Sequence, residues 1–189
     1  MDFPTGKYGC IYADPPWDFK TWSGKPNARG PQNHYNTMEI PTIAELPVAQ
    51  FAAENCVLFM WICWPTLLAA EKIFQSWGFD YKTCAFCWVK AKPLPLFPDD
   101  MRDQMGLGYW TRANSEVCLL ATRGKPKRKH ADVRQAILEP RREHSRKPDC
   151  VYDRIERLVD GPYLELFARQ TRPGWDSWGL EVNKFGEMA

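Results

Sequence analysis

The tetrapeptide Asp14-Pro15-Pro16-Trp17 holds the residues best suited to chemistry, and it follows an apolar run at residues 10–13. The Asp14 carboxylate accepts hydrogen bonds, as do prolyl carbonyls that no local N–H is expected to use, and the Trp17 indole presents a large flat ring. A flat heterocycle with an exocyclic amino group matches all three features, because its ring stacks while the acceptors take its two amino hydrogens. A tight turn in which Asp14 caps the next segment is the alternative.

The apolar run at residues 10–13 predicts a short buried strand that ends abruptly at Asp14. Neither Pro15 nor Pro16 can donate to a β-ladder or continue a helix, so the chain must leave the sheet there in one fixed shape. Ligands of open α/β sheets bind at the carboxyl ends of the strands. The tetrapeptide is therefore expected at the edge of a sheet where a ligand would lie.

The rest of the chain predicts strands that alternate with helices, which is typical of an α/β fold with a largely parallel sheet and right-handed crossovers. We expect strands at residues 56–61, 84–89, 116–121, 133–138 and 163–168. We expect helices at residues 42–55, interrupted near Pro47, at 65–77 and at 148–159. Residues 18–36 and 91–114 show neither period and are predicted to be long functional loops.

The composition predicts a single intracellular domain over residues 1–189. A chain of this length can form one proper core, and 44% hydrophobic with 25% charged residues is ordinary for a globular protein. No apolar run has the length of a membrane span, and the first residues lack the pattern of a signal peptide. We therefore expect no contact with a membrane.

The seven cysteines are predicted to be reduced, because their number is odd and five of them lie in apolar, strand-like runs. Cys84 and Cys87 have C-x-x-C spacing, but no second Cys or His pair accompanies them at the distance of a zinc site. In an extended strand their side chains would also point to opposite faces. We expect no metal site.

A basic segment at residues 123–147 is a candidate for contact with nucleic acid. It contains ten Lys or Arg against three acidic residues, and Lys127, Arg128 and Lys129 are consecutive. Such a segment is typical either of phosphate binding or of a merely solvated surface.

The loop at residues 91–114 is a second candidate. Tyr109, Trp110 and Arg112 combine aromatic faces with a cation, which suits stacking on bases and contact with phosphate. The alternative is that the two aromatic residues anchor the loop to the core.

Six further motifs follow the tetrapeptide in a fixed order: His34-Tyr35-Asn36-Thr37-Met38, Leu58-Phe59-Met60-Trp61, Glu116-Val117-Cys118-Leu119-Leu120, Ser145-Arg146-Lys147-Pro148-Asp149, Glu165-Leu166-Phe167-Ala168-Arg169 and Trp175-Asp176-Ser177-Trp178-Gly179. Over residues 8–182 the chain resembles the S-adenosylmethionine-dependent adenine-N6 methyltransferases with an Asp-Pro-Pro-Trp signature. That family is typified by the catalytic subunit of the eukaryotic mRNA adenosine methyltransferase, and its phage and bacterial members are more similar still. The resemblance implies a Rossmann-like class I methyltransferase in circularly permuted order, with the catalytic strand first and the cofactor strand last.

The resemblance also implies a role for each matching residue. Asp14, Pro15, Pro16 and Trp17 would be catalytic: the Asp14 carboxylate and the Pro15 carbonyl accept the amino hydrogens, and Trp17 stacks on the base. S-adenosyl-L-methionine would be the cofactor, held by Asp14, Tyr35, Lys147, Phe167, Arg169 and Glu181. Trp17, Tyr35 and Glu116 would surround the target base. The loop and basic residues would contact the rest of the polymer, namely Tyr109, Trp110, Arg112, Lys127, Arg128 and Lys129.

Leu180 departs from the family pattern. Relatives commonly have an asparagine at this position, and a leucine cannot make its hydrogen bonds. The departure implies either weaker cofactor binding or a ribose held by Glu181 alone. No separate target-recognition domain fits in this length, so the choice of target sequence would come from the loops, the basic segment or another subunit.

The function that these residues predict is transfer of a methyl group to the N6 amino group of adenine in DNA, with the base in a single strand or flipped out of a duplex. The similarity to phage and bacterial members favours DNA and the cytoplasm of a bacterial or phage-infected cell. The alternatives are adenosine-N6 methylation of RNA, a catalytically silent nucleic-acid-binding subunit and, ranked lower, a small-molecule amino methyltransferase. A homodimer or a partner subunit is compatible with each.

Overall fold

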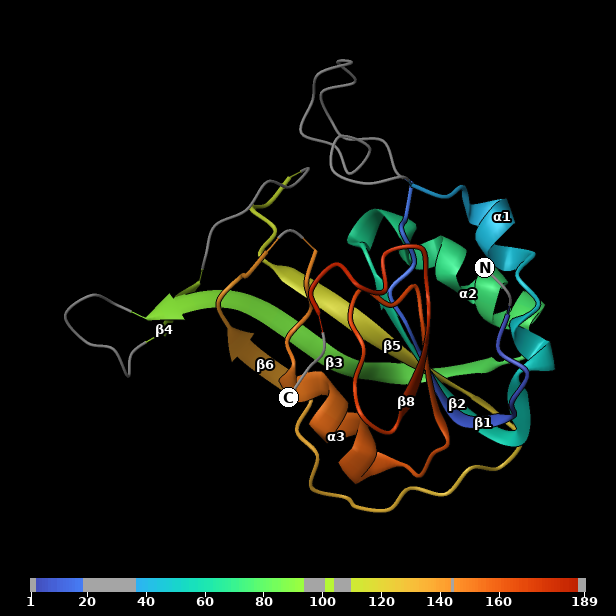
Figure 1. Cartoon of the computed structure of the whole chain (residues 1–189). Helices are drawn as coiled ribbons and strands as arrows, with labels where there is room; N and C mark the ends of the chain where they lie inside the picture. The colour runs from blue at the N-terminus through green and yellow to red at the C-terminus, as the bar shows by residue number, and fades with distance from the viewer. Residues whose placement is uncertain (1–2, 19–36, 94–100, 104–109, 144, 187–189) are drawn as a thin grey trace.

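The computed structural model describes residues 3–18, 37–93, 101–103, 110–143 and 145–186, which form one sheet with helices on both faces (Figure 1). The strands are β1 (Tyr8–Ala13), β2 (Ala52–Ile62), β3 (Asp80–Pro93), β4 (Met101–Asp103), β5 (Ser115–Arg123), β6 (Ala136–Glu139), β7 (Tyr163–Leu166) and β8 (Trp175–Trp178). The helices are α1 (Ile40–Ala44), α2 (Leu67–Trp77) and α3 (Cys150–Leu158), with 3₁₀ turns at Val48–Gln50 and Trp64–Thr66.

The strands lie in the order β4-β3-β5-β2-β1-β7-β8, with β6 beside β3. β1 is parallel to β2 and β7, β7 to β8, and β3 to β6, whereas β5 is antiparallel to both β2 and β3 and β4 is antiparallel to β3. The predicted Rossmann-like α/β class is confirmed, in a mixed and mostly parallel sheet. The circular permutation of the family's motif order stays a prediction.

The reversed direction of β5 decides what meets at each edge of the sheet. Ile62, the last residue of β2, pairs with Val117 near the start of β5. Cys56, early in β2, pairs with Arg123 at the end of β5. The start of β5 therefore lies beside the carboxyl ends of β1 and β2, and its end lies at the opposite edge.

Both faces of the central strands are buried. Along β1, Ile11 and Ala13 pack in the core formed with α1 and α2, while Cys10 and Tyr12 pack in the core formed with α3. A strand that is covered on both sides has no polar face, which explains why the sequence of β1 is almost continuously apolar.

The predicted helix at residues 42–55 is wrong. α1 ends at Ala44, a 3₁₀ turn follows Pro47, and β2 begins at Ala52. Ala52 pairs with Tyr8 of β1, so pairing across the sheet outweighs the helical propensity of the alanines in this segment. The loop predicted at residues 91–114 is also shorter than expected, because β3 continues to Pro93 and pairs with β4.

The expectation that Cys84 and Cys87 face opposite sides is wrong as well. β3 shifts register between Cys84 and Phe86, and both cysteines pack against the core on the α1 and α2 side. Such an irregularity breaks the two-residue alternation of a strand. The described residues contain no group of three or more side chains that could hold a metal ion. Among them, no helix is both long and apolar enough to cross a membrane.

Candidate active site

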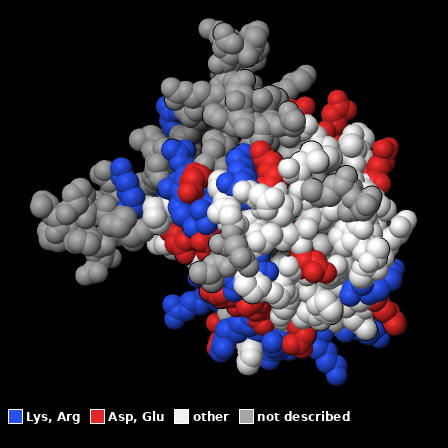
Figure 2. Space-filling view, viewed as in Figure 1, with Lys and Arg blue, Asp and Glu red and all other residues white. Residues whose placement is uncertain are grey.

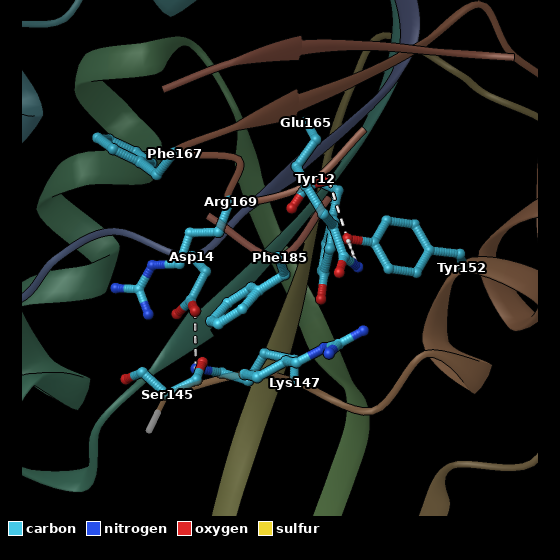
Figure 3. Close-up of a pocket in the computed structure, with 11 residues that line it drawn as sticks. Tyr12, Asp14, Ser145, Lys147, Tyr152, Glu165, Phe167, Arg169 and Phe185 are labelled. Atoms are coloured by element: carbon cyan, nitrogen blue, oxygen red, sulfur yellow. Dashed lines mark hydrogen bonds and ion pairs between the residues drawn. The ribbon is translucent and has the colours of Figure 1, made fainter. Parts of the chain in front are cut away.

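Four charged side chains meet where β1 and β2 end and β5 begins. Lys147 Nζ lies 2.8 Å from Asp14 Oδ2 and 3.2 Å from Glu116 Oε2, and Figure 3 shows the first of these contacts. Lys90 Nζ, from β3, lies 2.5 Å from the other Glu116 oxygen, Oε1. We call Lys90, Glu116, Lys147 and Asp14 the charge chain. The resemblance pointed to the last three, whereas Lys90 was missed.

Burial and ion pairing act in opposite directions on this chain. Burial raises the pKa of Glu116, but Lys147 and Lys90 outweigh it and lower that pKa to about 2. Burial lowers the pKa of Lys147, but the carboxylates of Asp14 and Glu116 outweigh it and raise that pKa above its ordinary value. Glu116 and Lys147 are therefore both charged at neutral pH.

The carbonyl groups of Pro15 and Pro16 are already hydrogen-bonded, which corrects the expectation that no local N–H uses them. The Trp17 N–H donates to the Pro15 oxygen over 2.8 Å, and the Met38 N–H donates to the Pro16 oxygen over 2.7 Å. A carbonyl oxygen has two lone pairs, so the Pro15 oxygen can still accept one more hydrogen bond. A parallel bridge between Trp17 and Met38 fixes the tetrapeptide to the segment that leads into α1.

Trp17 belongs to the core in this structure. Its side chain is 2% exposed, and its indole N–H donates to the Trp61 carbonyl over 2.9 Å. A base can stack on this ring only after the residues that now cover it move.

A hollow lies on the other side of Asp14, beside the ends of β1 and β7 (Figure 3). Four of the predicted residues line it, namely Asp14, Lys147, Phe167 and Arg169. Prediction missed the others: Tyr12, Ser145, Arg146, Tyr152, Glu165, Gln170 and Phe185. One signal was available, because an acidic residue inside an apolar strand, such as Glu165, is a buried polar group that needs an explanation.

Glu165 is the least solvated acidic group of the hollow. Its side chain is 7% exposed, and the Tyr152 hydroxyl donates to Glu165 Oε2 over 2.9 Å. Burial raises the pKa of Glu165 to about 8, against the opposing effect of the Tyr152 hydrogen bond. A carboxyl group in such a setting favours a ligand that brings its own hydroxyl or amino donors.

Two strained backbone positions border the hollow. Phe167, directly after β7, has φ 62° and Ser145 has φ 64°, and no other non-glycine residue in the described ranges has positive φ. Such conformations cost about 1–3 kcal/mol and cluster at functional sites. The hollow is therefore shaped by backbone geometry as well as by side chains.

The C-terminal segment forms one wall of the hollow. Arg169 Nε lies 3.2 Å from Glu181 Oε2, so two predicted cofactor residues contact each other. The Phe185 N–H donates to the Arg169 carbonyl over 3.0 Å, and the Arg146 guanidinium lies 5.1 Å from the Phe185 ring centroid. Leu180 is 85% exposed and so does not line this wall.

The structure does not bring every predicted residue to the site. Tyr35 and Tyr109 lie outside the described residues. Trp110 is 97% exposed, so the alternative in which it anchors its loop to the core is wrong. Arg112 is exposed too, and both residues lie shortly before Glu116 in the chain.

Lys127, Arg128 and Lys129 lie at the opposite edge of the sheet, in the segment that follows the end of β5. The Lys129 N–H donates to the Leu158 carbonyl, and its Nζ lies 3.0 Å from Asp160 Oδ1. Figure 2 shows Lys and Arg intermingled with Asp and Glu along this lower edge of the molecule. These residues are not part of the site around Asp14.

A Rossmann-like sheet, an Asp-Pro-Pro-Trp tetrapeptide at its carboxyl edge and a charged hollow beside it together define the class of α/β methyltransferases. The MT-A70 family model matches residues 8–181. The chain therefore belongs to the MT-A70 family, and the predicted enzyme class, an S-adenosylmethionine-dependent adenine-N6 methyltransferase, is confirmed.

Curated relatives share the domain over different fractions of their length. The chain is 34% identical to the type II methyltransferase M.MunI of Mycoplasma sp over 197 residues, which cover 95% of this chain and 79% of the relative. It is 29% identical to the human N(6)-adenine-specific methyltransferase METTL4, over 94% of this chain and 38% of the relative. It is 27% identical to the human N(6)-adenosine-methyltransferase catalytic subunit METTL3, over 94% of this chain and 29% of the relative. The chain thus spans well under half of these two human proteins.

The residues of the hollow fit the cofactor of this family. S-adenosylmethionine carries a carboxylate, an amino group, ribose hydroxyls and an adenine ring. The hollow offers Lys147 and Arg169 as cations, Asp14 and Glu165 as acceptors, and Phe185 as an aromatic face. Arg146 Nε, which is buried and has no partner in the described part of the chain, adds one more donor.

Proposed function

We propose that this enzyme methylates the N6 amino group of adenine in DNA. The observation that carries the proposal is the placement of Asp14, whose Oδ2 is held by Lys147 at 2.8 Å at the end of β1, between the hollow and Glu116. Within the described residues, no hydrogen bond occupies Asp14 Oδ1. This oxygen would accept a hydrogen bond from the amino group of a target base.

Asp14 and Pro15 would act on the amino group by accepting its two hydrogens. The adenine amino nitrogen is a weak nucleophile because its lone pair is delocalised into the ring. Two acceptors in fixed positions favour a tetrahedral nitrogen and direct its lone pair away from the ring. The Pro15 oxygen would use its second lone pair, since the Trp17 N–H occupies the first. The increase in the rate of methyl transfer would come from positioning and from preorganised electrostatics, and no covalent enzyme intermediate would form.

Bound S-adenosylmethionine supplies the methyl group as an electrophilic sulfonium. Lys147 and Arg169 would hold its carboxylate, Asp14 its amino group, and Glu165 or Glu181 its ribose hydroxyls. Phe167 and Phe185 would exclude water from the apolar part of the hollow. Tyr35 stays a predicted contact of both cofactor and base.

Support for DNA comes from the extent of the match to M.MunI. That bacterial relative matches over most of both chains, whereas the adenosine methyltransferases of plants and animals match over 23–29% of their length. We place the reaction in the cytoplasm of a bacterial or phage-infected cell. Trp110 and Arg112 are exposed before β5 and would contact the flanking polymer. RNA remains the second candidate because of those adenosine methyltransferase relatives.

The test supplies purified protein with labelled S-adenosylmethionine and, separately, duplex DNA, single-stranded DNA and RNA, followed by digestion and mass identification of the methylated nucleoside. We expect N6-methyldeoxyadenosine. Asp14→Asn should lower kcat by roughly 100-fold or more while calorimetry still detects cofactor binding. Asp80→Asn, at an exposed position on β3, is the matched control. N6-methyladenosine from RNA alone would overturn the choice of DNA, and absence of any product would favour the silent or partner-dependent subunit.

A further inference from the structure

Lys90 is a charged residue of the site that the proposed mechanism does not yet use. It lies on β3, the second strand along from β2, and its Nζ contacts Glu116 Oε1 at 2.5 Å. Its backbone N–H donates to the Asn114 carbonyl over 2.8 Å, and its Nζ lies 5.2 Å from the Trp88 ring centroid. The side chains of Lys90 and Glu116 are each 22% exposed, so this ion pair is largely buried.

Glu116 divides its charge between two lysines. Oε1 contacts Lys90 and Oε2 contacts Lys147, so each carboxylate oxygen has one cation. Lys147 in turn contacts two carboxylates, and its Nζ is nearer to Asp14, at 2.8 Å, than to Glu116, at 3.2 Å. Lys147 Nζ also lies 3.4 Å from the Ser145 carbonyl oxygen and 5.5 Å from the Trp61 ring centroid, but Asp14 and Glu116 are the two carboxylates that attract its charge.

Removal of the Lys90 charge would disturb the balance between these two attractions. The whole charge of Glu116 would then attract Lys147, and such an attraction is strong between partly buried groups. Lys147 Nζ would move toward Glu116 and away from Asp14 Oδ2. The Asp14 carboxylate would lose the contact that fixes its orientation, and with it the direction of the Oδ1 acceptor.

We infer that Lys90 is a positioning residue for methyl transfer, which keeps Lys147 on Asp14 by holding the far oxygen of Glu116. The inference rests on the proposed function, because it gives Asp14 the role stated above. Lys90 does not line the hollow, so it does not contact the cofactor itself and acts on Asp14 through Lys147.

The test compares Lys90→Met and Lys90→Arg with Lys82→Met. Lys82 lies on the same strand, is half exposed and forms a long, solvent-exposed ion pair of 3.9 Å with Asp80, so it controls for loss of a lysine from β3. Methionine keeps most of the apolar stem of lysine without the charge, and arginine keeps the charge.

We expect kcat of Lys90→Met to fall roughly 10- to 100-fold, because small displacements of a catalytic group have effects of this size. KM for S-adenosylmethionine should rise by a smaller factor than kcat falls, because Arg169 would still hold the cofactor carboxylate. Lys90→Arg should recover most of the rate, since a cation again neutralises Glu116. A kcat equal to that of Lys82→Met, or a loss confined to KM, would overturn the inference.

A crystal structure of cofactor-free Lys90→Met gives a readout that needs no activity. We expect Lys147 Nζ to leave Asp14 Oδ2 and to approach Glu116 Oε2. An unchanged contact between Lys147 and Asp14 would overturn the inference even if the rate fell. If the wild-type protein methylated no polymer, the proposed function would fail, and the structure of the variant would still decide how Lys147 is held.

Discussion

Replacement of Gly179 by alanine tests whether the cofactor hollow depends on a backbone contact between the ends of β7 and β8. A Cβ at residue 179 would lie 2.6 Å from the Ala168 oxygen, 2.7 Å from the Ala168 nitrogen and 2.8 Å from the Phe167 carbonyl carbon. All three are backbone atoms, so no side-chain rotation can relieve the overlap. Ordinary contact begins at 3.4 Å, and the Ala168 carbonyl must therefore move by about 0.8 Å.

This displacement has two expected effects. Overpacking of this kind costs about 1–3 kcal/mol of folding free energy. It also moves Phe167 and Arg169, which line the hollow on either side of Ala168. Loss of one charge-assisted contact costs about 1.5–3 kcal/mol, so we expect the Kd for S-adenosylmethionine to rise by about tenfold or more.

Gly78→Ala is the matched control. Gly78 has φ 78° at the end of α2, and a Cβ there would have no atom within 4 Å. Its cost is about 1–2 kcal/mol of backbone strain without overlap. Chemical denaturation should show both variants destabilised, whereas calorimetry should show weakened cofactor binding for Gly179→Ala alone. Equal cofactor affinity in the two variants would refute the dependence of the hollow on this contact.

Two further predictions concern ionisable groups. The folded state raises the pKa of Glu165 to about 8 from its ordinary 4.5, so the stability that the bound proton contributes is complete below pH 4.5 and is lost as the pH rises toward 8. Glu165→Gln does not titrate and should gain stability relative to wild type across that interval in urea unfolding, and a constant difference would contradict the burial argument. Lys127→Glu with Arg128→Glu should leave kcat/KM on a short oligonucleotide within about twofold and weaken binding of a long duplex with a flatter salt dependence. An equal loss on the short oligonucleotide would mean that the basic segment reaches the site.

Local patterns predicted the elements that carry the site. Apolar runs closed by Gly or Pro located β1 and α2 to within a few residues, because a turn residue or a break in periodicity leaves a mark in the sequence. The reversal of β5 and the irregularity of β3 left no such mark. They follow from pairing between strands that are distant in the chain. The same pairing explains why residues 52–55 form a strand although a helix was predicted there.

The residues of the candidate site likewise divide into those that local motifs predicted and those that depend on distant contacts. Asp14, Glu116 and Lys147 lie in motifs that the family resemblance supplied. Lys90 was missed because its partner is fixed by the register of β3 on β5, in which Trp88 pairs with Glu116. Phe185 lies beyond the last motif. Its place in the hollow depends on a backbone hydrogen bond to Arg169, which no sequence pattern predicts.

Lys147 and Asp14 belong both to the hollow and to the charge chain, and no other described residue belongs to both. A substitution at either one therefore changes cofactor contacts and target contacts together, and its kinetics cannot assign the loss to one side. Lys90 belongs to the charge chain but does not line the hollow, whereas Gly179 packs against Ala168 and Phe167 at the wall of the hollow. A lower kcat in the Lys90 variant together with a higher Kd for S-adenosylmethionine in the Gly179 variant would show that the charge chain and the cofactor hollow can be perturbed separately. Lys147 and Asp14 would then be the residues that connect them.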